Sequence, residues 1–243
     1  MLPKLEVPMY EVKLPLMKKT FRFRPFLVKE EKLLLMAMES NEEDTIFNSI
    51  KQIVNNCCID ELDVDLMPIT DLEFFFLNLR ARSIGEMVEL KYKCNNMVKD
   101  SEGNEKTCGN SVPFQVNILD IKPNFPEGHS DKLEFNEKMG VVMKYPNFEL
   151  FKSIKGNSEV ERLIHMIINC IDFIYDENNI YYAKDTSLEE ITEFIDNLPR
   201  EYFVKIQKFF ETMPKIEHTL DFKCSKCGYH EDLKVEGMQN FFV

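Results

Sequence analysis

Alternating apolar and polar positions open the chain and predict a β-hairpin. Residues 10–14 read Tyr-Glu-Val-Lys-Leu and residues 19–24 read Lys-Thr-Phe-Arg-Phe-Arg, so apolar side chains recur at every second position. This period of two is typical of strands with one buried face. We therefore expect Phe21 and Phe23 on one face of the hairpin and the two neighbouring arginines on the other.

Apolar residues that recur three or four positions apart predict helices in seven segments. The apolar side chains of such a segment share one face of a helix and can pack against a core. The predicted helices cover residues 28–40, 45–58, 70–85, 147–154, 158–175, 187–197 and 199–213.

Local signals mark where several of these helices begin. Ser187 and Glu190 fit the capping box Ser-x-x-Glu, in which each side chain accepts a hydrogen bond from the other residue's backbone N–H group. Thr70 is a candidate cap for the third helix. Pro199 falls in the first turn of the last helix, where its missing N–H group is not needed.

Further alternating stretches predict short strands between the helices. They cover residues 132–135, 140–145 and 180–183, and residues 123–130 form a link rich in turn residues before them. His129 lies in this link, and we expect it to be exposed. We predict an α+β fold with helices packed around short antiparallel strands and a split, two-knuckle element that resembles a zinc ribbon.

Two stretches that each hold a pair of cysteines read as copies of one unit. Residues 90–94 (Leu-Lys-Tyr-Lys-Cys) and 220–224 (Leu-Asp-Phe-Lys-Cys) are alternating strands that end in the first cysteine. A glycine follows the second cysteine of each pair, and another alternating strand lies beyond it. This pattern is typical of a zinc knuckle on a β-hairpin, where a tight turn directs two thiolates to one point and glycine adopts a backbone conformation that a Cβ would resist.

Two such knuckles supply the four ligands of one tetrahedral zinc site. Segments about 115 residues apart in the sequence would then meet at a single ion. Because four thiolates leave no open position for water, we expect the zinc to be structural and not catalytic. The predicted ligands are Cys94, Cys108, Cys224 and Cys227.

The first pair departs from a compact knuckle, and alternatives to zinc remain open. Thirteen residues separate Cys94 from Cys108, where a knuckle usually has about two to four. We interpret residues 95–107 as a polar insertion that bulges from the knuckle tip. The alternatives are four free thiols or a disulfide. His218 and His230 flank the second pair and are the residues that would replace a missing cysteine ligand.

The motifs divide the chain into four segments. These are residues 1–86 with the N-terminal hairpin and helices, 87–121 with the first knuckle, 122–213 with strands and a helical region, and 214–243 with the second knuckle and an apolar tail. Because the second knuckle returns to the first, we expect the four segments to form one integrated body.

Composition and charge limit the class of protein. The 243 residues are 44% hydrophobic and carry a net charge of −12, so the chain is an ordered globular one that is poorly suited to nucleic acid or anionic membranes. No apolar run of about 18 residues predicts a transmembrane helix. Seven cysteines without a signal peptide indicate metal ligands or free thiols. The 20 Phe and 13 Met residues suit a subunit of an assembly.

The sequence contains no catalytic motif, so we expect no enzyme activity. There is no Gly-rich phosphate loop, no Gly-x-Ser-x-Gly and no His-Glu-x-x-His. Two classes remain as alternatives to a structural protein. A zinc-ribbon adaptor of a transcription or nucleic-acid complex would show a basic surface stripe. A hydrolase with a hidden site would show two carboxylates about 5–10 Å apart in a cleft.

Three features of the sequence carry a resemblance to a known family. They are residues 19–40, which begin Lys-Thr-Phe-Arg-Phe-Arg-Pro-Phe, the Met-Lys-Tyr-Pro of residues 143–146, and the split cysteine pairs. In these the chain resembles the baseplate hub proteins of T-even-type contractile-tailed phages. The resemblance implies a non-enzymatic structural or assembly protein of the virion tail, made in the host cytoplasm, that contacts other hub and tail subunits. It assigns no residue roles, so the zinc prediction rests on the cysteine spacing.

Overall fold

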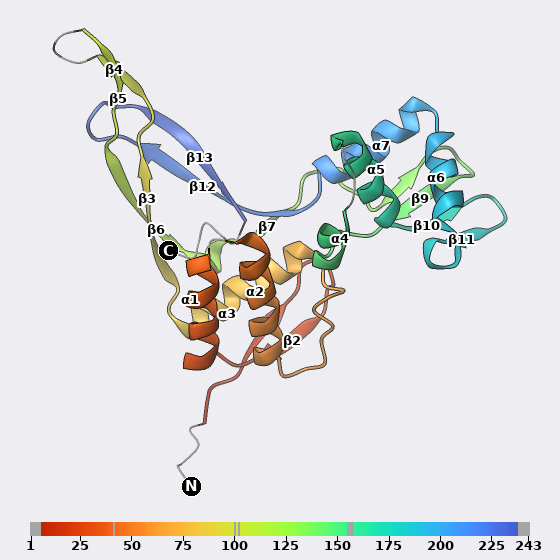
Figure 1. The fold of residues 1–243 in the computed structure, drawn as a ribbon, viewed down its shortest axis with the longest axis horizontal. Helices are drawn as coiled ribbons and strands as arrows, with labels where there is room; N and C mark the ends of the chain where they lie inside the picture. Colours follow the sequence, from red (N-terminus) through yellow and green to blue (C-terminus); the bar gives the residue numbers. More distant parts are fainter. Residues whose placement is uncertain (1–5, 41, 100, 102, 155–157, 238–243) are drawn as a thin grey trace. The chain divides into compact units, whose positions relative to one another are not determined.

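A computed structural model describes residues 6–40, 42–99, 101, 103–154 and 158–237 of the chain (Figure 1). In this part of the chain, helices are interspersed with short strands that pair in the antiparallel sense. The α+β class predicted from the sequence is confirmed. None of the described helices combines the length and the apolar character needed to span a membrane.

The described residues form two compact units. Unit 1 contains those within 6–64, 70–124 and 215–237, and unit 2 contains those within 65–69 and 125–214. Both cysteine pairs belong to unit 1, although most of unit 2 lies between them in the sequence. The four-segment division made from the motifs stays a prediction.

Unit 1 combines three helices with small antiparallel sheets among its described residues. Two-stranded sheets form from β1 with β2, β3 with β6, and β4 with β5, and a three-stranded sheet has the order β13-β12-β7. Its elements are β1 (Tyr10–Lys13), β2 (Thr20–Phe23), α1 (Val28–Ser40), α2 (Glu43–Cys57), α3 (Ile69–Ser83), β3 (Met87–Lys93), β4 (Met97–Lys99), β5 (Glu105–Thr107), β6 (Ser111–Asn117), the 3-10 helix η1 (Ile118–Asp120), β7 (Pro123–Asn124), β12 (Lys215–Lys223) and β13 (His230–Glu236).

The N-terminal hairpin is confirmed, with its predicted faces. β1 pairs with β2 in a register that sets Tyr10 opposite Phe23. Phe21 and Phe23 are only 6% and 1% exposed. The Phe23 ring lies 5.4 Å from the ring of Phe75 on α3, while Arg22 on the opposite face binds Asp60 at the surface. The hairpin therefore buries its aromatic face against α3.

Helix α3 is enclosed on most of its circumference and holds a buried carboxylate. Asp71 is fully buried, and its two carboxylate oxygens accept hydrogen bonds from the backbone N–H groups of Leu16 (2.9 Å) and Met17 (2.7 Å). Burial raises the pKa of Asp71 although both N–H groups favour its charged form. These bonds fasten the turn between β1 and β2 to α3. Thr70 is not the cap that the sequence suggested, because the helix already begins at Ile69.

The start of α1 is fixed by Glu30, whose side chain is 1% exposed. One carboxylate oxygen accepts the backbone N–H of Leu27 at 2.9 Å, and the other binds the guanidinium of Arg24 at 3.0 Å. The contact with Leu27 is the reach-back half of a capping box. Burial alone would raise the pKa of Glu30, but the hydrogen bonds from Arg24 and the Leu27 N–H outweigh it and lower this pKa below its usual value.

We expect Glu30→Gln to destabilise the protein by about 2 kcal/mol at pH 7, because the amide can still accept from Leu27 but leaves the Arg24 charge unpaired. A carboxyl group with a lowered pKa stabilises the fold above its unfolded pKa, and this contribution disappears as the pH falls through the folded-state pKa. The difference between wild type and variant should therefore shrink in acid. Urea unfolding at several pH values measures it. Glu31→Gln, an exposed change in the same turn, should have almost no effect, and a pH-independent difference would contradict the assignment.

Unit 2 packs helices against a four-stranded antiparallel sheet of order β11-β10-β9-β8. Strands and helices contribute side chains to one shared core, which includes Val141 and Met143 from the sheet and Ile167, Ile191 and Phe209 from the helices. The elements are β8 (Lys132–Glu134), β9 (Gly140–Met143), α4 (Phe148–Ser153), α5 (Glu159–Asn169), β10 (Ile171–Tyr175), β11 (Ile180–Tyr182), the 3-10 helix η2 (Ala183–Asp185), α6 (Leu188–Asp196) and α7 (Arg200–Glu211).

The prediction of one helix over residues 158–175 is wrong for its last six residues. α5 ends at Asn169, and residues 171–175 form β10 between β9 and β11. The apolar spacing of α5 continues into Ile171, which hid the boundary. The segment Ile-Asp-Phe-Ile-Tyr also suits a strand, because β-branched and aromatic residues pack well on a pleated sheet. Pairing with strands on both sides decides between the two structures.

The prediction that His129 is exposed is wrong. Its side chain is half-buried, and each of its two ring nitrogens makes a hydrogen bond. Nδ1 lies 2.9 Å from the hydroxyl of Thr212 and Nε2 lies 2.9 Å from the hydroxyl of Tyr145. The ring stacks on Phe209 at 5.2 Å. Burial lowers the pKa of His129. The link before β8 is thus fastened to the end of α7.

The remaining helix starts follow the local signals closely. Ser187 and Glu190 form the complete capping box of α6. Pro199 occupies the cap position of α7, one residue before the first turn in which the sequence placed it. Asn147 and Ser158 cap α4 and α5 through their side chains.

Candidate metal centre

The first knuckle is a tight turn closed by two backbone hydrogen bonds. The N–H of Cys94 donates to the carbonyl of Asn110 at 2.8 Å, and the N–H of Gly109 donates back to the carbonyl of Cys94 at 3.0 Å. Gly109 has a φ of 64°, which lies in the left-handed region that favours glycine. The turn brings Cys94, which follows β3, and Cys108, which precedes β6, to the same end of the β3–β6 hairpin.

The second knuckle repeats this geometry residue by residue. The N–H of Cys224 donates to the carbonyl of Tyr229 at 2.8 Å, and the N–H of Gly228 donates to the carbonyl of Cys224 at 2.9 Å. Gly228 has a φ of 74°. The strands β12 and β13 lead into and out of this turn as β3 and β6 do in the first. The two stretches are therefore structural copies, as the sequence predicted.

The insertion in the first knuckle is itself a hairpin, β4–β5, and not a loop. Met97 pairs with Thr107 and Lys99 with Glu105. At its base the N–H of Cys108 donates to the carbonyl of Asn96 at 2.8 Å. The hairpin leaves and re-enters the knuckle at adjacent points, so the thirteen residues between Cys94 and Cys108 do not displace the second cysteine of the pair.

The two knuckles bring the four-cysteine cluster (Cys94, Cys108, Cys224 and Cys227) together. All four Sγ atoms lie within 4.8 Å of one another. Sγ of Cys94 is 3.6 Å from that of Cys227, and Sγ of Cys108 is 3.8 Å from that of Cys224. A disulfide has an S–S distance of about 2.05 Å, so the disulfide alternative does not apply. Four thiols so close together could hold one metal ion.

Aromatic side chains enclose the cluster from both hairpins. Phe114 of β6 lies 6.0 Å from Phe222 of β12, and each contacts a tyrosine of its own hairpin, Tyr92 and Tyr229. Cys94 and Cys224 are 0% and 1% exposed, whereas Cys227 is half-buried. The ring contacts join the hairpins beneath the sulfurs and keep water away from them.

Two asparagines that the sequence reasoning missed direct their amides at the sulfurs. Nδ2 of Asn96 lies 3.7 Å from Sγ of Cys227, and Nδ2 of Asn110 lies 3.6 Å from Sγ of Cys224. Each amide thus crosses from the first knuckle to a sulfur of the second. Such donors stabilise a thiolate and orient a metal ligand. The available signal was their position, two residues after each cysteine of the first pair.

The backbone of the second knuckle favours a thiolate at Cys224. Burial of this sulfur raises its pKa, but the N–H groups of Cys227 and Lys226 donate to it and bring the pKa down to about 6. At Cys94 burial dominates and raises the pKa to about 12. Because a metal ion binds the deprotonated sulfur, metal binding to the cluster must release protons.

The two histidines considered as substitute ligands lie elsewhere. His230 binds the carboxylate of Asp221 across the β12–β13 ladder at 2.5 Å, and both side chains are exposed. His218 lies on β12 opposite Val235, near the far end of the ladder. Within the described residues, the group of side chains able to hold a metal consists of the four cysteines alone.

Unit 1 is thus an α+β body in which the four-cysteine cluster joins two β-hairpins. The family described as T4 bacteriophage base plate protein matches residues 7–243, and the chain belongs to this family. No curated protein and no solved structure matches it. Membership identifies a structural component of a phage baseplate, located in the virion tail and assembled with other tail components. This family membership agrees with the resemblance of residues 19–40 to phage baseplate proteins.

Proposed function

We propose that this protein is a structural or assembly component of the baseplate hub, that it acts through protein–protein contacts, and that one structural zinc ion holds unit 1 together. The observation that carries the zinc assignment is the four-cysteine cluster. The resemblance of residues 19–40 to hub proteins supports the place in the hub.

The spacing of the sulfurs fits zinc. In a regular tetrahedron with zinc–sulfur bonds of about 2.3 Å, neighbouring sulfurs lie about 3.8 Å apart. The closest sulfur pairs of the cluster lie 3.6 and 3.8 Å apart. Four protein thiolates fill the coordination sphere, so the ion supplies a cross-link and no position at which water or a substrate could be activated. This geometry supports a structural role for the ion.

Metal analysis tests the assignment directly. We expect the purified chain to contain close to one zinc per molecule. Cobalt(II) that replaces the zinc should show the intense thiolate-to-metal absorption of a tetrahedral four-sulfur site. Iron also binds in tetrahedral sulfur sites, so iron in place of zinc, or a content far below one ion per chain, would contradict the proposal.

The location of the chain tests the hub assignment separately. A cryo-EM map of the assembled baseplate, or of its hub intermediates, should place the protein at the centre. Density for it only in the periphery would exclude the hub and leave family membership intact. Binding to DNA that weakens steeply with added salt would favour the nucleic-acid adaptor instead.

A further inference from the structure

We propose that a pocket on unit 2, between α6 and the loop that joins β8 to β9, receives a segment of another polypeptide in which an apolar side chain is flanked by lysine or arginine. All residues that line the pocket belong to unit 2, so binding of the segment does not depend on zinc in unit 1. It adds to the proposed function by stating what kind of partner segment this protein recognises.

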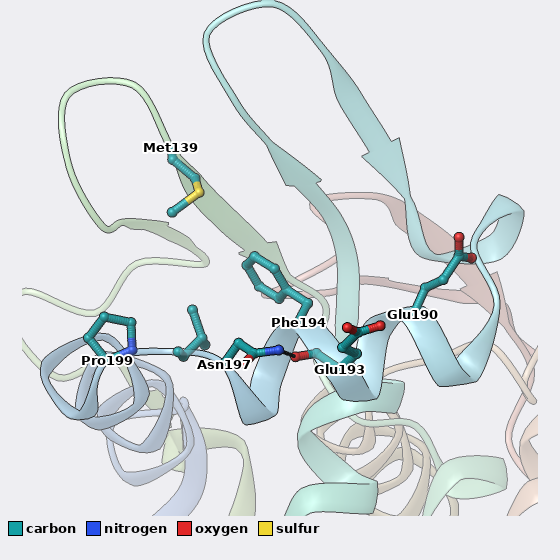
Figure 2. A pocket seen from close by; sticks show the side chains of 7 residues that line it. Met139, Glu190, Glu193, Phe194, Asn197 and Pro199 are labelled. Carbon is teal, nitrogen blue, oxygen red and sulfur yellow. Dashed lines mark hydrogen bonds between the residues drawn. The ribbon is translucent and has the colours of Figure 1, made fainter.

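The pocket has a volume of about 420 Å³ and an apolar floor. Met139, Phe194 and Leu198 form this floor, and Pro199 closes one end. Figure 2 shows the ring of Phe194 rising from α6 toward Met139. The three floor residues are half-buried and pack against the core of unit 2. Packing against the core therefore fixes these three side chains, and an apolar side chain of a partner can contact them without rearrangement of the pocket.

The rim of the pocket is acidic. Glu190 and Glu193 line it from successive turns of α6, and both are exposed. Glu190 accepts hydrogen bonds from the backbone N–H and the hydroxyl of Ser187, which lowers its pKa and keeps it ionised. No hydrogen bond or ion pair engages the Glu193 carboxylate within the described part of the chain. The side chain of Asn197 is already engaged by the backbone carbonyl of Glu193, as the dashed line in Figure 2 shows.

Helix α6 has no basic residue that could balance the negative charge of its acidic side chains. The sequence Leu-Glu-Glu-Ile-Thr-Glu-Phe-Ile-Asp carries four acids and no base. Glu189 and Glu193 are four residues apart, and Glu193 and Asp196 are three apart, so these like charges lie close together on the helix surface and repel. Two lysines of unit 2 already have acidic or carbonyl partners: Lys138, in the loop between β8 and β9, binds Glu177, and Lys205 of α7 donates to the carbonyl of Glu134.

An apolar floor beneath an acidic rim selects the chemistry of its occupant. An aliphatic or aromatic side chain would bury its surface on Met139 and Phe194. A lysine or arginine beside it would meet Glu193 and the free oxygen of Glu190, and its charge would relieve the repulsion along α6. Acidic or purely polar segments would gain neither contact.

The test uses the full chain, labelled at its methyl groups for NMR, and a capped peptide, Gly-Lys-Arg-Leu-Arg-Lys-Gly, as the probe. We expect saturable shifts of the Met139 and Leu198 methyl signals, with a Kd on the order of 0.1–1 mM. Raising the salt from about 50 to 300 mM should weaken binding roughly threefold or more, because surface charges are screened. Serine in place of the leucine, or glutamate in place of each basic residue, should abolish the shifts.

Variants of the protein locate the interaction. Glu193→Gln should weaken binding of the probe at least about fivefold, since it removes the unpaired rim charge. Glu211→Gln removes an equal charge from the last residue of α7, which does not line the pocket, and should change the Kd by less than about twofold. Both sites are exposed, so both variants should fold. Equal effects of the two changes, binding of the glutamate peptide, or no methyl shifts at millimolar probe would each overturn the proposal.

Discussion

Replacing Cys224 with serine is expected to abolish the proposed zinc binding and to separate the β3–β6 hairpin from the β12–β13 hairpin in unit 1. A structural zinc site in small zinc-binding peptides contributes about 10–16 kcal/mol of apparent binding free energy, and this becomes folding free energy when the ligands come together only in the folded chain. Besides the cluster, the two hairpins are joined by the ring contact between Phe114 and Phe222 and by the amides of Asn96 and Asn110, which themselves contact the sulfurs. We expect a loss of at least about 3 kcal/mol, a large part of a typical total stability of about 5–15 kcal/mol.

Hydrogen exchange measured by mass spectrometry can locate this loss. Protection should fall in β3, β6, β12 and β13, while α5 to α7 of unit 2 stay protected. Cys58→Ser is the matched control, because the half-buried Cys58 sulfur lies 3.4 Å from the carbonyl of Asp60 and a hydroxyl can make the same contact. The control should hold its zinc. A Cys224→Ser protein with normal zinc content and normal protection would show that the cluster is not the link we describe.

The second large effect is expected at Asp71. Asp71→Ala removes both acceptors for the backbone N–H groups of Leu16 and Met17 and leaves a small cavity under the β1–β2 turn. Each N–H group left without a partner costs about 1–3 kcal/mol, so we expect a loss of about 3–4 kcal/mol in urea unfolding.

A graded series separates the hydrogen bonds from the change in volume. Asp71→Asn has nearly the same size but offers one acceptor and one donor group in place of two acceptors. Its stability should therefore fall between the wild type and the alanine variant. If asparagine were as stable as aspartate, the carboxylate would not be what fastens the turn. An alanine variant within about 0.5 kcal/mol of wild type would lead to the same conclusion.

The cysteine knuckles could be predicted because their signal is local. The alternating strand, the cysteine and the following glycine recur within a few residues in both stretches, and Gly109 and Gly228 have the positive φ that the pattern requires. The four ligands named from the sequence are the four sulfurs that the fold brings together. Local signals also set the capping box of Ser187 and the faces of the first hairpin.

The features that sequence reasoning missed depend on distant partners. β10 is a strand because β9 and β11 lie on either side of it, whereas its own residues also continue the spacing of α5. His129 is held by Thr212, 83 residues further along the chain. The amide of Asn110 reaches a sulfur 114 residues away. No pattern within a short window contains such pairs, so only the folded chain shows them.

The long separation between the two knuckles has a consequence for synthesis of the protein. Cys108 and Cys224 are 116 positions apart, and ribosomes add about 5–20 residues per second. The first knuckle therefore leaves the ribosome about 6 to 23 seconds before the second. During that time β3, β6 and the β4–β5 hairpin exist without their partner strands, while the contiguous residues 125–214 of unit 2 are completed. Closure of unit 1 thus has to wait until the second knuckle has been made, and the proposed zinc ion can be bound by all four cysteines only from that moment.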